Sequence, residues 1–241
     1  MTFPVWILFV SIPCCLCSNS WNKRLLINDQ TALHETIQKL QTELQQLKSE
    51  VTQLKQQRAP VATPLSSYTR WGRHSCPAGS TLIYRGFAGG HSYNETGSGV
   101  NFLCLPDDPL WGIHKDGYNS YSGWILGAEY EGGYFFESGI RDSDVPCAVC
   151  LTPHSTSIVI PARNACYDGW HLEYTGYLMS NAHRHPGESE YICVDAHPDV
   201  IPNSSSNTNG AVLYMVESIC QSLPCPPYVA GRELTCAVCS K

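Results

Sequence analysis

The chain has 241 residues, 43% of them hydrophobic, which suits one sizeable domain or two small ones and excludes a wholly disordered protein. The net charge of −6 argues against a nucleic-acid-binding protein, because no excess of Lys and Arg is present to neutralise phosphates. Thirteen cysteines are too many for a reducing compartment unless they bind metal.

Residues 1–20 are interpreted as a signal peptide. An apolar run at residues 5–12 is too short to span a bilayer, and Pro13 and small residues follow it. Removing this leader takes away three cysteines and leaves ten, the even number expected of a disulfide-bonded secreted protein. No later stretch is apolar enough for a membrane anchor. We therefore expect a secreted, extracellular protein with no membrane span.

Residues 22–58 carry leucines at intervals of seven, which are typical of a coiled coil. The predicted core residues at heptad positions a and d are Leu26, Leu33, Ile37, Leu40, Leu44, Leu47, Val51 and Leu54. At about 1.5 Å per residue this helix is a rod about 55 Å long. The pattern predicts a homo-oligomer and permits dimers or trimers. The alternative is a lone helix folded back on the globular part, but so narrow an apolar stripe would bury little there.

A short linker is predicted over residues 59–67, where Pro60 and Pro64 end the helix. The remainder of the chain is duplicated. Cysteines of the first part recur 89 or 90 positions later, as the pairs Cys76 and Cys166, Cys104 and Cys193, Cys147 and Cys236, and Cys150 and Cys239. This offset predicts a first subdomain at 68–151 and a second at 152–241.

Both repeats contain aromatic-rich runs of period-two character separated by Gly, Pro, Asn and Ser, and neither shows helical periodicity. The predicted fold is therefore an all-β, disulfide-rich head of two pseudo-symmetric subdomains behind an α-helical coiled-coil stalk.

The tetrapeptide CAVC occurs twice, at 147–150 and 236–239. Zinc binding is the less favoured interpretation in a secreted chain with an even number of cysteines, and a redox motif would need a helix that neither copy has. In a strand, residues three apart point to opposite faces, so each cysteine should bond to a different partner. Spacing alone leaves three connectivities open within each repeat. Cys220 and Cys225 occur only in the second repeat and are expected to pair with each other.

Four motifs carry a resemblance to a known family: PCAVC at 146–150, IVIP at 158–161, CYDGW at 166–170 and YTGYLM at 174–179. They resemble the junction in the duplicated non-collagenous C-terminal domain of type IV collagen, and still more the related head of sponge-type (spongin-type) short-chain collagens. The similarity covers about residues 68–241. It implies an all-β head of two similar subdomains that trimerises and guides chain assembly.

The resemblance also implies the disulfide pairing. It pairs Cys76 with Cys150, Cys104 with Cys147, Cys166 with Cys239 and Cys193 with Cys236, and it matches Cys220 and Cys225 to an extra pair. It favours a trimer. The chain departs from the family in having no Gly-x-y run, and a coiled coil stands where a triple helix would be.

Two N-glycosylation sequons occur, at Asn94 and Asn203. A metal site at His183 and His185, and calcium binding at 107–108 or 142–144, are weaker interpretations than polar surface loops, so we expect no metal and no cofactor. In a Gly- and Ser-rich loop, Tyr118, Tyr121 and Trp124 are candidates for stacking on a sugar, with core packing of Trp124 an equal alternative. No catalytic motif is present, so we do not expect an enzyme.

The sequence thus predicts a secreted, glycosylated and oligomeric protein with a structural or assembly role of the extracellular-matrix type. The alternative is a multivalent carbohydrate- or surface-recognition protein, lectin-like or innate-immune, in which the stalk clusters weakly binding heads.

Overall fold

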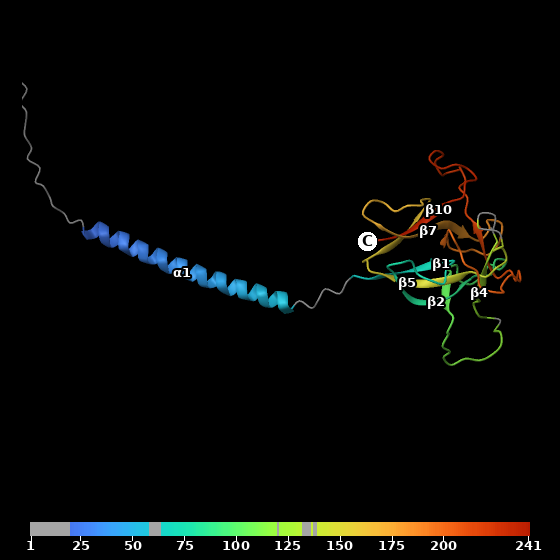
Figure 1. Ribbon diagram of the computed structural model, residues 1–241, viewed down its shortest axis with the longest axis horizontal. Coiled ribbons are helices and arrows are strands. Elements are labelled where there is room, and N and C mark those ends of the chain that lie inside the picture. Colours follow the sequence, from blue (N-terminus) through green and yellow to red (C-terminus); the bar gives the residue numbers. More distant parts are fainter. Residues whose placement is uncertain (1–19, 58–63, 120, 132–135, 137–138) are drawn as a thin grey trace, which may run out of the picture. The chain divides into compact units, whose positions relative to one another are not determined.

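The computed structural model describes residues 20–57, 64–119, 121–131, 136 and 139–241 (Figure 1). The predicted signal peptide lies outside these residues except for its last position. The chain divides into two compact units, Met1–Ala62 and Thr63–Lys241. We refer to the helix of the first unit as the stalk and to the second unit as the head.

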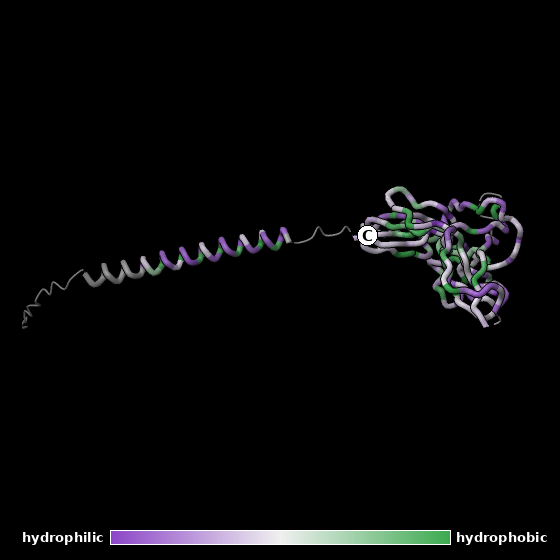
Figure 2. The backbone as a smooth tube through the Cα atoms, turned by 90° about the horizontal axis from the view of Figure 1, so that it is seen from below, coloured by the Kyte–Doolittle hydropathy of each residue, from purple (hydrophilic) through white to green (hydrophobic). Residues whose placement is uncertain are grey.

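The stalk is one helix, α1 (Ser20–Gln57), as predicted. It forms because good helix formers such as Leu, Gln, Glu and Lys fill it without Gly or Pro. Its predicted core residues from Leu33 to Leu54 are 43–64% exposed in the single chain. Figure 2 shows hydrophobic positions recurring along a mainly hydrophilic helix. Leu26 lies outside the side chains that the structure describes.

The head is built from β-strands and stabilised by five disulfides, in agreement with the predicted fold class. Its strands are β1 (Ser66–Trp71), β2 (Thr81–Gly90), β3 (Leu103–Pro106), β4 (Leu126–Tyr130), β5 (Pro146–Thr152), β6 (Ser157–Pro161), β7 (His171–Ser180), β8 (Ile192–Asp195), β9 (Ala211–Met215) and β10 (Thr235–Ser240). Ser66 and Ser67, placed in the predicted linker, pair with Thr152 and Leu151 at the start of β1.

The strands form one sheet in the order β6-β10-β7-β8-β1-β5-β2-β4-β9, with β3 paired to β2. A further pairing joins β9 to β7. It closes a path that runs from β7 through β8, β1, β5, β2, β4 and β9 back to β7. Figure 1 shows the result, with β1 and β5 lying near β7 and β10 although they come from different repeats. The strands of the two repeats therefore belong to one continuous sheet.

Both CAVC motifs lie in strands, the first in β5 and the second in β10. Each of these strands is central to its part of the sheet: β5 pairs with β1 and β2, and β10 pairs with β6 and β7. Their four cysteines are fully buried. The main core beside them draws on both repeats, and its fully buried members include Tyr130, Val194 and Leu213.

No helix in the described part of the chain is both long and apolar enough to cross a membrane.

Candidate assembly interface

The two CAVC motifs anchor all four long disulfides. Cys76 bonds to Cys150, Cys104 to Cys147, Cys166 to Cys239 and Cys193 to Cys236, with Cα–Cα distances of 5.7–5.9 Å. The fifth joins Cys220 to Cys225. These are the pairs that the resemblance implies. Because residues three apart in a strand face opposite sides, one cysteine of each motif reaches the start of its repeat and the other reaches the middle.

The parts of the head contributed by the two repeats meet along a line that we call the seam. At the seam β1 pairs with β8 in parallel, with Trp71 opposite Val194. Next to this pair, Arg70 forms an ion pair with Asp195 at 2.7 Å, and both side chains are largely buried. Arg70 also donates to the carbonyl oxygen of Ser75, and its guanidinium lies 5.7 Å from the Tyr174 ring centroid. The pair is therefore held in one orientation.

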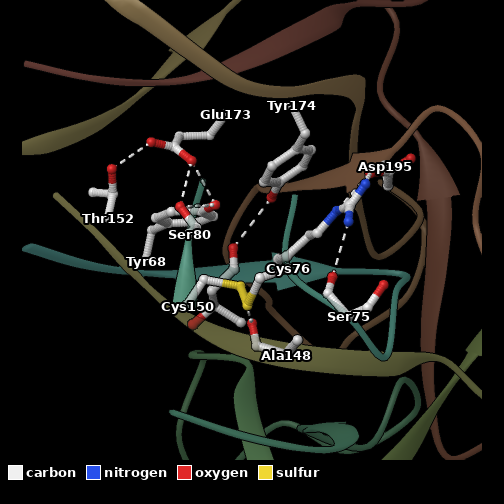
Figure 3. Close-up of a disulfide and its surroundings, with 12 residues drawn as sticks. Tyr68, Ser75, Cys76, Ser80, Ala148, Cys150, Thr152, Glu173, Tyr174 and Asp195 are labelled. Carbon is white, nitrogen blue, oxygen red and sulfur yellow. Dashed lines mark hydrogen bonds and ion pairs between the residues drawn. A yellow bond between two sulfur atoms is a disulfide. The ribbon is translucent and has the colours of Figure 1, made fainter. Parts of the chain in front are cut away.

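A buried carboxylate, that of Glu173, crosses the seam (Figure 3). Its Oε2 accepts hydrogen bonds from the hydroxyls of Tyr68 at 2.7 Å and Ser80 at 2.8 Å. Its Oε1 accepts from Thr152 and Ser240, each at 2.6 Å. Tyr68 and Ser80 come from the first repeat and Ser240 from the second, so one side chain of β7 ties both repeats together.

The charge of Glu173 is stabilised by the hydroxyl groups around it. Burial raises the pKa of Glu173, but the hydroxyl donors of Ser240, Thr152, Tyr68 and Ser80 outweigh it and leave the pKa below its ordinary value. Burial also raises the pKa of the Tyr68 hydroxyl, so this donor keeps its proton. The His154 ring lies nearby, with Nδ1 at 3.9 Å from Oε1. The site is therefore a set of hydrogen-bond donors around a carboxylate, and Ser240 within it is fully buried.

Glu173 reaches the seam because it occupies a β-bulge. The register between β7 and β10 passes from Tyr174 directly to Leu172, which leaves Glu173 as the extra residue. In β2 the register with β5 passes from Tyr84 to Leu82 in the same way and leaves Ile83 as the extra residue. A bulge redirects its side chain out of the regular alternation. Glu173 is 6% exposed, whereas Ile83 is 52% exposed.

The same contrast holds for the partner strand. Tyr68 of β1 lies opposite Cys150, and Ile158 of β6 lies opposite Cys239, so the two residues hold corresponding places. Tyr68 is buried against Glu173, but Ile158 remains exposed. The head therefore has one seam with a polar, buried contact, and it carries the corresponding pair of residues, Ile83 and Ile158, on its surface.

A groove of about 730 Å³ borders β6. It is lined on one side by Ile158 and Val159 of β6 and on another by Leu103 of β3. All three side chains are exposed, Val159 and Leu103 by just over half. Polar side chains such as Asn101 and Glu190 complete the lining. Among the described residues β6 pairs only with β10, and a hollow with exposed apolar side chains beside such a strand is suited to binding another protein surface.

The loop from residue 196 to 210 fastens the second repeat to the first. The backbone N–H of Asp199 donates to the carbonyl oxygen of Gly72 at 2.7 Å. Arg73 donates to the carbonyl oxygen of His197 at 2.7 Å and to the Asp199 carboxylate at 3.0 Å. Tyr130 donates to the carbonyl oxygen of Asp199 at 3.1 Å. We call residues 196–210 the clasp loop.

The other predicted sites lie on the surface. Asn94 and Asn203 are both exposed, as glycosylation would require. His185 bonds through Nδ1 to the side chain of Asn181, and His183 is exposed beside it. Among the described residues, no group of three or more His, Cys, Asp or Glu is arranged to hold a metal ion.

The aromatic residues of the long loop between β3 and β4 are not core residues. Tyr118 and Tyr121 are almost fully exposed and Trp124 is 53% exposed. The core alternative for Trp124 is therefore wrong.

Sequence reasoning missed Glu173, Tyr68 and the Arg70–Asp195 pair. One signal was present: aligning the two repeats places Glu173 opposite Ile83, a charged residue at a position that is apolar in the other copy.

No family model matches the chain.

Proposed function

We propose that this protein is a secreted extracellular structural or assembly protein, in which coiled-coil stalks join heads of the type IV collagen non-collagenous kind. In this proposal each head consists of two pseudo-symmetric subdomains, and the favoured oligomer is a trimer. The resemblance of the motifs around 146–179 motivates the family, and the five disulfides suit an oxidising compartment.

The correspondence of the two repeats supports pseudo-symmetry. The long disulfides span 74 and 43 positions in the first repeat and 73 and 43 in the second. Gly86 lies opposite Cys147 in β2, and Gly176 lies opposite Cys236 in β7. A Cβ at either glycine would come within 1.7 Å of a carbonyl oxygen on the neighbouring short strand. The same close approach of a carbonyl oxygen to a glycine therefore occurs at equivalent positions of both repeats.

One observation carries the assembly function. The seam buries Tyr68 of β1 against Glu173 of β7, and the corresponding residues Ile158 of β6 and Ile83 of β2 are both exposed hydrophobics. We infer that Ile158 of one copy packs against Ile83 of the next, which repeats the seam between chains. Such a head-to-tail contact uses two different surfaces and closes into a ring when the rotation between copies is suitable.

The stalk supports the same conclusion. Its leucine stripe is exposed in the single chain, and burying such a stripe against copies of itself is the usual role of heptad leucines. Parallel stalks would raise the local concentration of the heads, so a weak contact between heads would be sufficient.

Sedimentation of the secreted full-length protein tests the proposal. We expect a trimer that the variant Leu40→Lys/Leu47→Lys weakens, while the matched variant Thr42→Lys/Ser49→Lys, with the same spacing outside the stripe, leaves it intact. In the head, Ile158→Glu should weaken association further, and the same change at Ile219, an isoleucine elsewhere that is more exposed than Ile158, should not. A wild-type protein that is monomeric at micromolar concentration would contradict the proposal.

A second candidate function is multivalent glycan recognition, supported by the exposed rings of Tyr118 and Tyr121 in the loop between β3 and β4. A glycan array probed with the intact oligomer distinguishes the two functions. Selective binding that is lost in Tyr118→Ser/Tyr121→Ser would favour recognition, and the absence of selective binding would favour assembly.

A further inference from the structure

Two histidine rings lie together beside the hydroxyl groups that surround Glu173. His154 follows β5, and His171 is the first residue of β7. Their ring centroids are 5.3 Å apart, and the ring planes are inclined by 39°. The His154 side chain is 34% exposed, and His171 is exposed as well. Both rings are therefore accessible from solvent, whereas the carboxylate next to them is buried.

The position of the proton on the neutral His154 ring follows from the groups near its Nδ1. This nitrogen lies 2.7 Å from Ser240 Oγ and 3.0 Å from Thr152 Oγ1. Each hydroxyl has one proton, and both hydroxyls donate to Glu173 Oε1 at 2.6 Å, as Figure 3 shows for Thr152. The lowered pKa of Glu173 keeps its carboxylate charged, so it only accepts. Nδ1 therefore carries the hydrogen and donates it to the hydroxyl oxygens.

This arrangement leaves the lone pair of His154 Nε2 directed away from the cluster. Among the residues that the structure describes, no hydrogen bond reaches this nitrogen or either ring nitrogen of His171. In metal sites, an imidazole ligand usually donates its other N–H to a carboxylate, a carbonyl or water, which fixes the tautomer of the ring. His154 has such a partner, since two hydroxyls connect its Nδ1–H to the Glu173 carboxylate.

The distance between the rings suits a shared metal ion. Zinc binds imidazole nitrogens at about 2.0–2.1 Å with tetrahedral angles, so two imidazoles on one ion have centroids roughly 5 Å apart. The observed 5.3 Å agrees with this value. The carboxylate Oε1 of Glu173 lies 3.9 Å from Nδ1 of His154. A negative charge on that side of the ring makes the opposite nitrogen a better ligand.

The first repeat lacks this pair of rings. Ser240 of β10 lies opposite His171 of β7, and in the first repeat Leu151 of β5 lies opposite Thr81 of β2. Thr81 thus stands where the imidazole would be, and Leu151 stands where the hydroxyl would be. One pair of rings per chain is the consequence.

We propose that His154 Nε2 and a ring nitrogen of His171 together bind one divalent ion of the kind that imidazole favours, such as Zn²⁺. Water completes the coordination, because no third His, Cys, Asp or Glu joins the pair among the described residues. Two imidazoles bind an ion less tightly than the four protein ligands of a structural zinc site, so binding is reversible. The proposal replaces the sequence-based expectation of no metal, and it does not depend on the assembly proposed above.

Calorimetric titration of Zn²⁺ into the metal-free full-length protein tests the site. We expect one ion per chain in the wild type. His154→Ala and His171→Ala should each weaken zinc binding by about tenfold or more, because loss of even an outer partner of a ligand costs about 10–100-fold. His183→Ala, which removes an exposed imidazole elsewhere, is the control and should change nothing. Absence of zinc binding by the wild type, or binding that either of the two variants retains, would overturn the proposal.

Electron spin-echo spectroscopy with one equivalent of Cu²⁺ supplies a second readout, since it counts the imidazoles on the ion. Two are expected in the wild type and one in His171→Ala. This variant decides the matter, because the exposed His171 ring makes no hydrogen bond in the described structure, so its loss leaves the Glu173 cluster intact. An unchanged urea midpoint checks that it is folded. A single imidazole in the wild type would contradict the site, as would an Nε2–H tautomer of His154 in the ¹⁵N NMR spectrum of the metal-free protein.

Discussion

Tyr68 and Glu173 stand 105 positions apart in the chain, yet the Tyr68 hydroxyl donates to the Glu173 carboxylate at 2.7 Å across the seam. The contact joins β1 of the first repeat to the bulge of β7 in the second. Each residue has an equivalent in the other repeat, Ile158 and Ile83, and neither equivalent is polar. The two repeats therefore differ where they face each other.

Tyr68→Phe should lower the free energy of unfolding by about 1.5–3 kcal/mol, because it removes a hydrogen bond to a buried charged group. Urea unfolding at neutral pH measures this. Tyr84→Phe is the matched control: its hydroxyl donates to the neutral carbonyl oxygen of Cys104 near the surface, so about 1 kcal/mol or less is expected. Equal losses in the two variants would show that the hydrogen bond to the buried carboxylate contributes no more to stability than one to a neutral carbonyl oxygen.

Acidification should weaken the head through Glu173. Its folded pKa is lowered, so its contribution is complete above the ordinary carboxyl pKa of about 4.3 and is lost as the pH falls through the folded value. The stability difference between wild type and Glu173→Gln, measured by urea unfolding, should therefore shrink from pH 7 to pH 3.

Glu131→Gln is the control of opposite sign, because burial and then the nearby Asp142 charge raise the Glu131 pKa. Its carboxylate is disfavoured when charged, so this variant should gain stability relative to wild type as the pH rises. A Glu173→Gln difference that stays constant with pH would contradict the assignment.

Removing a long disulfide should cost more than removing the short one. Cys76→Ala/Cys150→Ala opens a loop of 74 positions, and the chain-entropy model gives about 4 kcal/mol for it. Cys220→Ala/Cys225→Ala opens a loop of 5 positions, for which the same model gives about 2 kcal/mol. Secretion yield and urea midpoints of the paired variants report the difference. Normal secretion and an unchanged midpoint without Cys150 would contradict its role in closing the first repeat.

Gly176→Ala should separate β7 from β8. A Cβ at this position would come within 1.7 Å of the Val194 carbonyl oxygen, which belongs to the backbone and has little room to move. A loss of about 1–3 kcal/mol or more is expected from such overpacking. Gly127→Ala in β4 is the control, because nothing lies within 4 Å of the place that its added methyl group would take. Similar unfolding midpoints for both variants would show that the strand spacing adapts.

Local patterns in the sequence were sufficient for the element types. The heptad of leucines predicts α1, and the period-two aromatic runs predict strands at the places where β2, β3, β7 and β8 form. These patterns act over a few residues, so they need no knowledge of the fold. The disulfide partners came from the resemblance, since spacing within one repeat allowed three connectivities.

The seam required the tertiary structure. Glu173 sits in an ordinary strand pattern, and only the bulge and the closure of the sheet through β8 and β1 bring it to Tyr68, Ser80 and Thr152.

The sequence by itself determined a helical stalk, a duplicated head and eight cysteines in matching positions, because heptads, strand periodicity and repeat spacing are properties of the linear chain. Only the tertiary structure decided which repeat surfaces are buried and which are left exposed. Burial depends on which strands become neighbours, and within the described residues the sheet that makes β1 a neighbour of β8 leaves β6 paired on one side, with β10.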